Sequence, residues 1–233
     1  MRDTSSSNYF YNHHARACSE TDFWGQVKRS VNGQPVDKGQ INMIVSAIVE
    51  GLQLGANDFL LDLCCGNGAL TTEIVKHCRR GFGVDLSEHL IYIAKKYFEK
   101  SGREDYQFGD ALEFVSTAKN NQGYDKALCY GSFSYFSRQD SLMFLQNLQI
   151  HFPGISRLFV GNLADQDKIH EFYRDDLYEP GIEDDPTSPL GVWWSREAFS
   201  QMASEAGWQC IFTKMPEQFY AHHYRFDATM MPA

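Results

Sequence analysis

Residues 59–71 read FLLDLCCGNGALT, and this stretch decides the fold. A short apolar run leads to Asp62, and Gly66 and Gly68 then bracket a single residue. Such a run bounded by glycines is typical of a strand buried on both faces. Glycines suit a tight turn where backbone approaches a ligand closely. A helix-compatible run follows over residues 69–77, and its N-terminus would point unpaired N–H groups at that ligand. The stretch therefore predicts a nucleotide-type pocket at the carboxyl end of a first strand.

The sequence of the turn distinguishes between two classes of nucleotide cofactor. A dinucleotide fingerprint has a third glycine in G-x-G-x-x-G, but Thr71 stands there, and Asp62 is not part of that fingerprint. The stretch resembles motif I of class I S-adenosylmethionine (SAM)-dependent methyltransferases, acid-x-Gly-x-Gly-x-Gly. Asp62, Gly66 and Gly68 match this motif, and Cys64 replaces its first glycine. The resemblance implies SAM as cofactor, bound by these four residues, with Asp62 holding the methionine ammonium group directly or through water.

Composition narrows the class of protein. The 233 residues carry a net charge of −9 without a basic block, which argues against nucleic acid as the main partner. No apolar run approaches a membrane span of ~20 residues, and from the polar N-terminal residues we expect no secretory signal. The six cysteines show no C-x-x-C spacing, so we expect no metal site and a cytoplasmic protein.

Strands and helices alternate along most of the chain. A capped helix over 23–27, a turn over 31–35 and a helix from Asp37 to about Leu52 precede the first strand. Later strands are predicted at 81–84, 106–108, 124–130, 156–160, 208–213 and 219–226, and helices at 88–100, from 111, at 139–152 and at 195–206. This order predicts an α/β fold with a doubly wound, seven-stranded, mostly parallel sheet and a C-terminal antiparallel hairpin.

The predicted elements divide the chain into parts with different roles. We expect an N-terminal helical cap over 1–54 and a SAM-binding methyltransferase domain over 55–233. The irregular, acidic stretch 163–192 is predicted as an insert on the acceptor side.

Three acids end successive predicted strands: Asp62, Asp85 and Asp110. Asp85 has the spacing of an acid that accepts both ribose hydroxyls. Asp110 resembles the family motif whose carboxylate meets the adenine amino group. Each acid alone is more often a helix N-cap, but three in register favour a cofactor site. The neighbours Leu86 and Ala111 are assigned to the cofactor as well.

The loop at residues 129–136, after the fourth strand, resembles the family loop between the sulfonium and the acceptor. Aromatic faces attract a sulfonium cation, so Tyr130 is assigned to the cofactor and Tyr135 to catalysis. The Asn-Pro-Pro-Tyr signature is absent, which argues against methylation of DNA bases.

Residues 220–227 read YAHHYRFD and are the most suggestive acceptor-side segment. A hydroxyl acceptor must lose a proton, and a neutral imidazole suits that role. Strand alternation would put His223 and Arg225 on one face and His222 on the other. The segment resembles the ending of small-molecule methyltransferases from bacterial surface-polysaccharide gene sets. That resemblance favours His223 and Arg225 as catalytic residues and a sugar or sugar-nucleotide acceptor.

Other aromatic and histidine side chains are predicted to bind the acceptor: Tyr11, Trp24, Trp194 and His222. For Trp194, anchoring of the loop is an equal alternative. The expected reaction is O-methylation of a small soluble molecule. N-methylation, a NAD-dependent oxidoreductase on the same fold and a non-catalytic SAM-binding protein stay open as alternatives.

Overall fold

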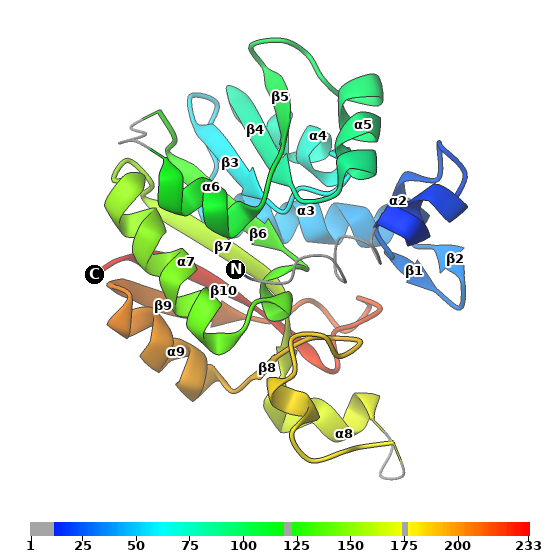
Figure 1. The fold of residues 1–233 in the computed structure, drawn as a ribbon, viewed down its shortest axis with the longest axis vertical. Helices are drawn as coiled ribbons and strands as arrows, with labels where there is room; N and C mark the ends of the chain where they lie inside the picture. Colours follow the sequence, from blue (N-terminus) through cyan, green and yellow to red (C-terminus); the bar gives the residue numbers. More distant parts are fainter. Residues whose placement is uncertain (1–11, 119–122, 174–176) are drawn as a thin grey trace. The chain divides into compact units, whose positions relative to one another are not determined.

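The computed structural model describes residues 12–118, 123–173 and 177–233 (Figure 1). The chain divides into two compact units, Met1–Phe114 and Val115–Ala233.

The first unit begins with short helices and a hairpin. Residues 12–17 are helical, and α2 (Phe23–Gln26), β1 (Ser30–Val31), β2 (Gln34–Pro35) and α3 (Lys38–Leu52) follow. Asp22 and Asp37 cap α2 and α3, because their carboxylates accept hydrogen bonds from the N–H groups of Gly25 and Gln40. The turn predicted at 31–35 joins β1 to β2.

Three parallel strands form the rest of this unit in the order β5-β4-β3. They are β3 (Phe59–Leu63), β4 (Arg80–Asp85) and β5 (Glu104–Phe108). The connecting helices α4 (Ala69–Val75) and α5 (Glu88–Tyr97) pack against the strands, and α6 (Ala111–Thr117) follows β5 (Figure 1). The three carboxyl ends meet at one edge, where ligands of open α/β sheets bind.

The second unit continues the alternation. It contains β6 (Lys126–Tyr130), α7 (Arg138–His151), β7 (Arg157–Asp165), α9 (Arg196–Glu205), β9 (Trp208–Thr213) and β10 (Arg225–Pro232). The strand order is β6-β7-β10-β9, with β6 parallel to β7 and β10 antiparallel to both neighbours. The predicted fold class, mostly parallel strands flanked by helices with an antiparallel C-terminal pair, is confirmed.

The strand predicted at 156–160 is longer in the structure. Strand β7 continues to Asp165, so the start of the 163–192 insert belongs to it. The insert contains α8 (Ile169–Phe172), and the unpredicted strand β8 (Trp193–Trp194) after it pairs with β7.

The strand predicted at 219–226 is mostly a turn, and β10 begins only at Arg225. Backbone N–H groups of Phe219, His222 and Tyr224 bond to carbonyls three residues back, so local turns replace a strand ladder there. The argument from strand alternation therefore does not apply to His222 and His223.

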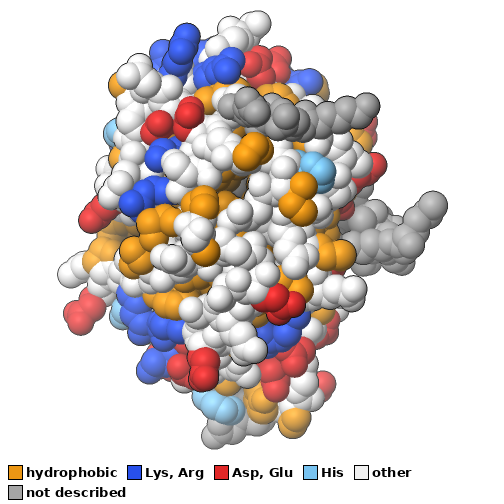
Figure 2. Space-filling model, turned by 90° about the vertical axis from the view of Figure 1, so that its left-hand side faces the viewer, with side chains coloured by type: hydrophobic (Ala, Val, Ile, Leu, Met, Phe, Trp, Pro, Cys, Tyr) orange, Lys and Arg blue, Asp and Glu red, His pale blue; other side chains and the backbone are white. Residues whose placement is uncertain are grey.

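On the face drawn in Figure 2, acidic and basic side chains are interspersed. Among the described residues, no helix is long and apolar enough to cross a membrane.

Candidate functional site

The turn after β3 has an unusual backbone. Cys64, Gly66 and Gly68 have φ values of 66°, 59° and 77°. Glycine adopts this left-handed conformation freely, whereas other L-residues are strained in it. Position 64 therefore demands the conformation that the motif's usual glycine supplies, and cysteine occupies it at a cost.

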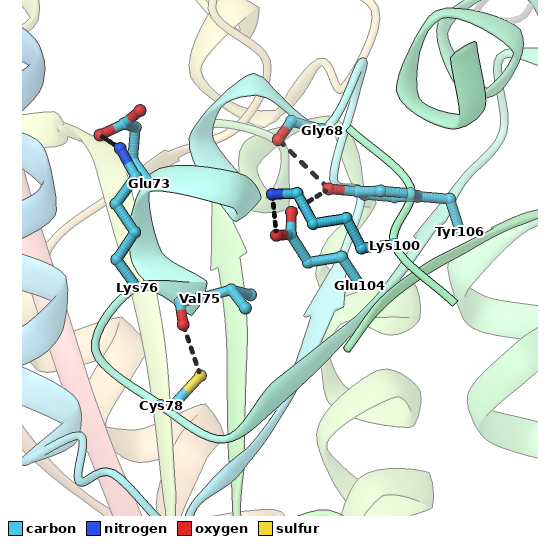
Figure 3. Close-up of polar contacts among 8 residues, drawn as sticks. All are labelled: Gly68, Glu73, Val75, Lys76, Cys78, Lys100, Glu104 and Tyr106. Carbon is cyan, nitrogen blue, oxygen red and sulfur yellow. Dashed lines mark hydrogen bonds and ion pairs between the residues drawn. The ribbon is translucent and has the colours of Figure 1, made fainter. Parts of the chain in front are cut away.

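Close packing explains the glycine at position 68. An added Cβ would lie 2.8 Å from Cζ of Tyr106. The Tyr106 hydroxyl is 3.4 Å from both the Gly68 carbonyl and Oε2 of Glu104, which is buried and pairs with Lys100 at 3.0 Å (Figure 3). The turn thus rests on a tyrosine that is itself bonded to a buried carboxylate, whose ion-pair partner Lys100 is exposed.

Asp85 joins the end of β4 to the turn. Its Oδ2 accepts a hydrogen bond from Gly66 N at 2.8 Å, and its Oδ1 accepts one from Ser87 N at 2.8 Å. Burial raises the pKa of this carboxyl, and the two N–H bonds act in the opposite direction. The side chain is half-buried. The carboxylate is therefore fixed in orientation at the predicted ribose site.

Asp62 lies at the end of β3 with 3% of its surface exposed. Thr71 donates its hydroxyl to Oδ2 of Asp62 at 2.6 Å. Burial raises the pKa of Asp62 to about 7, while the Thr71 bond and the positive charge of Arg29 oppose the rise. A cationic ligand group nearby would favour the ionised form.

Asp110 serves first as a helix cap. Its Oδ1 accepts hydrogen bonds from Leu112 N at 2.7 Å and Glu113 N at 3.2 Å, at the start of α6. Its contact with a cofactor stays a prediction. Of the two neighbours assigned with these acids, Leu86 is half-buried and Ala111 is buried.

Three N–H groups of the turn and of the helix start already form hydrogen bonds within the chain. Gly66 N binds Asp85, Gly68 N binds the Cys65 carbonyl, and Ala69 N binds Oδ1 of Asn67. The expectation that the helix after the turn offers unpaired N–H groups is therefore wrong for Ala69, its first residue. A pyrophosphate needs such donors, whereas the ribose hydroxyls and ammonium group of SAM are donors that the carboxylates can accept. The residues present fit SAM better than a dinucleotide.

Sequence reasoning missed the side chains that fasten the turn to the N-terminal segment. Asn67 is 1% exposed, and its Nδ2 donates to the Phe23 carbonyl at 2.7 Å and to Oε1 of Gln26 at 2.8 Å. In the sequence, the one hint of this network is the position of Asn67 between the two glycines. Of the predicted acceptor residues of this unit, Trp24 is half-buried with the Arg29 guanidinium 5.8 Å from its ring, and Tyr11 lies outside the described residues.

In the second unit, the predicted aromatic residues are largely enclosed. Tyr130 is buried at the end of β6, and the half-buried Tyr135 donates its hydroxyl to the Pro189 carbonyl at 3.1 Å. Trp194 is 1% exposed and packs against Phe133 and Phe199, with the Arg138 guanidinium 4.4 Å from its ring. These contacts support the loop-anchoring alternative for Trp194.

The two predicted catalytic residues, His223 and Arg225, differ in their exposure to solvent. His223 is exposed in the turn before β10, whereas Arg225 is buried at the start of that strand. His222 is half-buried with Nδ1 3.2 Å from the Phe219 carbonyl. The catalytic role of His223 stays a prediction.

A bulge in β7 places further polar groups near Arg225. Asn162 has a φ of 63° and lies where the β7–β10 register shifts. Oδ1 of Asp227 accepts a hydrogen bond from Asn162 N at 2.7 Å, and Nη1 of Arg225 donates to Asn162 O at 2.8 Å. Bulges commonly re-aim side chains beside active sites. Asp227 lies inside the segment 220–227, but its sequence context gave no indication of this role.

Two charged side chains at the bulge keep a buried polar atom without a partner among the described residues. These atoms are Nε of Arg225 and Oδ2 of Asp227. Burial raises the pKa of Asp227 to about 6, and the Asn162 N–H and the charge of Arg225 oppose the rise. Buried polar atoms of this kind call for an explanation, such as a ligand or an ordered water.

No candidate metal-binding cluster is found in the parts of the chain that the structure describes. Residues 12–118, 123–173 and 177–233 contain no group of three or more His, Cys, Asp or Glu side chains that could hold an ion.

Comparison with known proteins identifies the domain. Residues 60–151 match the family described as "Methyltransferase domain". A relative from Methanococcus vannielii named "Probable cobalt-precorrin-6B C(15)-methyltransferase (decarboxylating)" is 33% identical over 96 residues, 40% of this chain. The chain spans 52% of the length of that relative. The predicted enzyme class, a methyltransferase with SAM as its methyl donor, is confirmed for the matched domain.

Solved structures share the fold over nearly the whole chain. Magnesium protoporphyrin IX methyltransferase from Synechocystis PCC 6803, with S-adenosylhomocysteine (SAH) bound, has a TM-score of 0.64 at 13% identity and covers 99% of this chain and 96% of its own. Phosphoethanolamine N-methyltransferase 1 from Haemonchus contortus has a TM-score of 0.69 at 14% identity and covers 98% and 49%. The acceptors of these proteins differ widely, so the shared fold does not indicate an acceptor.

The strain at Cys64 predicts an unusual order of stability among its variants. Cys64→Val should lower the free energy of unfolding by about 1–3 kcal/mol, because a β-branched residue tolerates positive φ poorly. Cys64→Gly should stay within about 1 kcal/mol of the parent, because relief of strain offsets the greater entropy of the unfolded chain. Urea unfolding would measure both, with Cys64→Ala as the control for loss of the thiol. Equal stability of the valine and glycine variants would contradict the strain.

Asp62 predicts a pH dependence of stability. Its pKa in the folded protein, about 7, lies above the ordinary value of 3.8. Between these values the unfolded chain has released a proton that the folded protein keeps, so stability falls as pH rises from about 4 to 7, by up to about 4 kcal/mol from this group. Asp62→Asn should reduce that slope in urea unfolding measured across the pH range. Asp85 and Asp227 still titrate in the variant, so part of the slope remains, but a slope that does not fall at all would contradict the assignment.

Proposed function

We propose that this chain is a methyltransferase that transfers the methyl group of SAM to a hydroxyl of a small acceptor, with a sugar or sugar nucleotide as the preferred class. The methyltransferase domain over residues 60–151 supports the methyl donor. The resemblance of the C-terminal segment 220–227 to enzymes of polysaccharide gene sets supports the acceptor class.

On the cofactor side, we assign the ribose hydroxyls to Asp85 and the ammonium group to Asp62. Asp85 is held by Gly66 N and Ser87 N, and each carboxylate oxygen keeps a further lone pair for a ligand hydroxyl. Asp62 carries its carboxyl group at the end of β3, beside Thr71. Asp110 keeps its predicted role toward the adenine amino group.

The residues Arg225 and Asp227 support a hydroxyl as the group that is methylated. Arg225 Nε is a donor and Asp227 Oδ2 an acceptor, and both are buried without a partner among the described residues. A hydroxyl both donates and accepts hydrogen bonds, so it can satisfy both atoms. An ammonium group only donates and would be repelled by the guanidinium.

The reaction balances with Asp227 as proton acceptor. SAM supplies a methyl group on a positively charged sulfur. The acceptor oxygen bonds to the methyl carbon, the carbon–sulfur bond breaks with its electrons moving to sulfur, and the hydroxyl proton passes to Asp227. A carboxyl whose pKa is raised to about 6 is well matched to this role near neutral pH. His223 is the second candidate base, because it is exposed to solvent in the preceding turn.

N-methylation of a small metabolite is the second candidate. A phosphoethanolamine N-methyltransferase has the same fold, so the fold is compatible with this reaction as well. We further propose that the acceptor is small rather than nucleic acid and that the protein acts in the cytoplasm. The acidic balance of the sequence supports the first of these.

The cofactor assignment predicts that Asp85→Ala abolishes SAM binding. Calorimetry should show heat with SAM and none with NAD for the parent protein, and no heat with SAM for the variant. Glu88→Ala removes an exposed acid of the same unit and should bind SAM normally. Unchanged affinity of Asp85→Ala would remove this assignment, and heat with NAD alone would favour the oxidoreductase.

The acceptor assignment predicts preference for hydroxyls. Sugars and nucleotide sugars, each paired with its amino-sugar analogue, would be incubated with methyl-labelled SAM. We expect labelled product from the hydroxyl member of a pair, and Asp227→Asn should lower turnover at least tenfold without weakening SAM binding. Asp167→Asn, an exposed acid of the same unit, serves as the matched control. Transfer only to amines would favour N-methylation.

A further inference from the structure

The cofactor turn contains a residue that its own conformation disfavours. Cys64 is left-handed without being glycine. Strained backbone of this kind persists only where surrounding structure holds it. Contacts that fix the turn from outside are therefore needed for its binding-competent shape.

One such contact comes from the N-terminal segment, which we define as residues 12–27. The Asn67 side chain lies between the glycines of the turn and divides its bonds between two elements. Its Oδ1 accepts from Ala69 N at 3.2 Å, within the turn. Its Nδ2 donates outward, to the Phe23 carbonyl and to Gln26 Oε1 of α2.

Gln26 is itself fixed. It is fully buried, and its Nε2 donates to the carbonyls of Ser19 and Glu20, both at 3.0 Å. A buried amide with its donors and acceptor all bonded has one orientation available. Gln26 thus transmits the position of the segment to Asn67.

The same segment also contacts the loop after β4, which contains Ser87. Oδ1 of Asn12 accepts from Ser87 Oγ at 2.7 Å and from His89 N at 3.2 Å. Ser87 N in turn donates to Asp85. One segment is therefore bonded both to the glycine turn and to the loop that orients the ribose acid.

We propose that Gln26 is a positioning residue for SAM: through Asn67 it makes the affinity of the turn for the cofactor depend on the docked N-terminal segment. This inference rests on the cofactor assignment above. Because coupling between two sites is reciprocal, SAM binding also stabilises the docked segment.

The test uses Gln26→Met, which keeps the volume of the side chain while removing its hydrogen bonds. SAM and SAH affinities would be measured by calorimetry at a temperature where circular dichroism shows every variant folded. We expect roughly tenfold weaker binding of both, the effect of about one buried hydrogen bond. Glu20→Ala removes the exposed contacts of this carboxylate with Lys96 and Tyr97 but keeps the backbone carbonyl that Gln26 binds, so its affinity should stay within twofold of the parent.

A second variant separates positioning from general loss of stability. Asn67→Asp keeps the acceptor for Ala69 N but loses the donors to Phe23 and Gln26. If the two side chains act as one link, the double variant should bind SAM no more weakly than Asn67→Asp alone. Independent effects that multiply would overturn the link.

Hydrogen exchange gives the reciprocal readout. Saturating SAM should slow exchange of the Lys28 and Arg29 amides, which bond back into α2, in the parent and in Glu20→Ala. The slowing should be lost in Gln26→Met. Folded Gln26→Met with parental SAM affinity would overturn this inference alone, whereas a parent protein that binds no SAM would overturn the cofactor assignment with it.

Discussion

The sign of φ at three alternate positions is the constraint on which the first unit depends. The chain turns sharply after β3 only because residues 64, 66 and 68 are all left-handed. That geometry brings Gly66 N to Asp85 and seats Gly68 on Tyr106. It also turns Asn67 toward α2. The acid, the aromatic support and the N-terminal helix are each arranged around a backbone that few sequences can adopt.

The two units use the same physical device. In the first, Asp85 accepts a hydrogen bond from the N–H of left-handed Gly66. In the second, Asp227 accepts one from the N–H of left-handed Asn162. In both cases the carboxyl is buried enough for its pKa to rise. In each unit, a carboxylate that stabilises a left-handed backbone conformation is also a polar group that a ligand can bind. Folding and the proposed function therefore depend on the same side chain at both places.

The sequence predicted the fold class and the acids of the first unit because their signals are local. Glycine spacing, strand-end acids and helix caps such as Asp37 depend on residues a few positions apart. The network of Asn67 and Gln26 joins residues 41 positions apart, and the Asn162–Asp227 bond joins residues 65 apart. The periodic patterns of helices and strands relate only residues that are close in sequence, so they cannot predict such pairs. The error at 219–226 has a different cause, because an aromatic-rich stretch fits a strand, whereas hydrogen bonds between residues three apart form turns there.

The internal bonding of the turn has a practical consequence for the solution chemistry of the protein. The N–H groups of Gly66, Gly68 and Ala69 bind a carboxylate, a carbonyl and an amide oxygen of the chain itself. Free oxyanions such as sulfate or phosphate therefore find no open donors at these three positions. Buffers and precipitants rich in such anions should leave this turn empty, unlike the phosphate-cradling loops of nucleotide-binding proteins with similar glycine spacing.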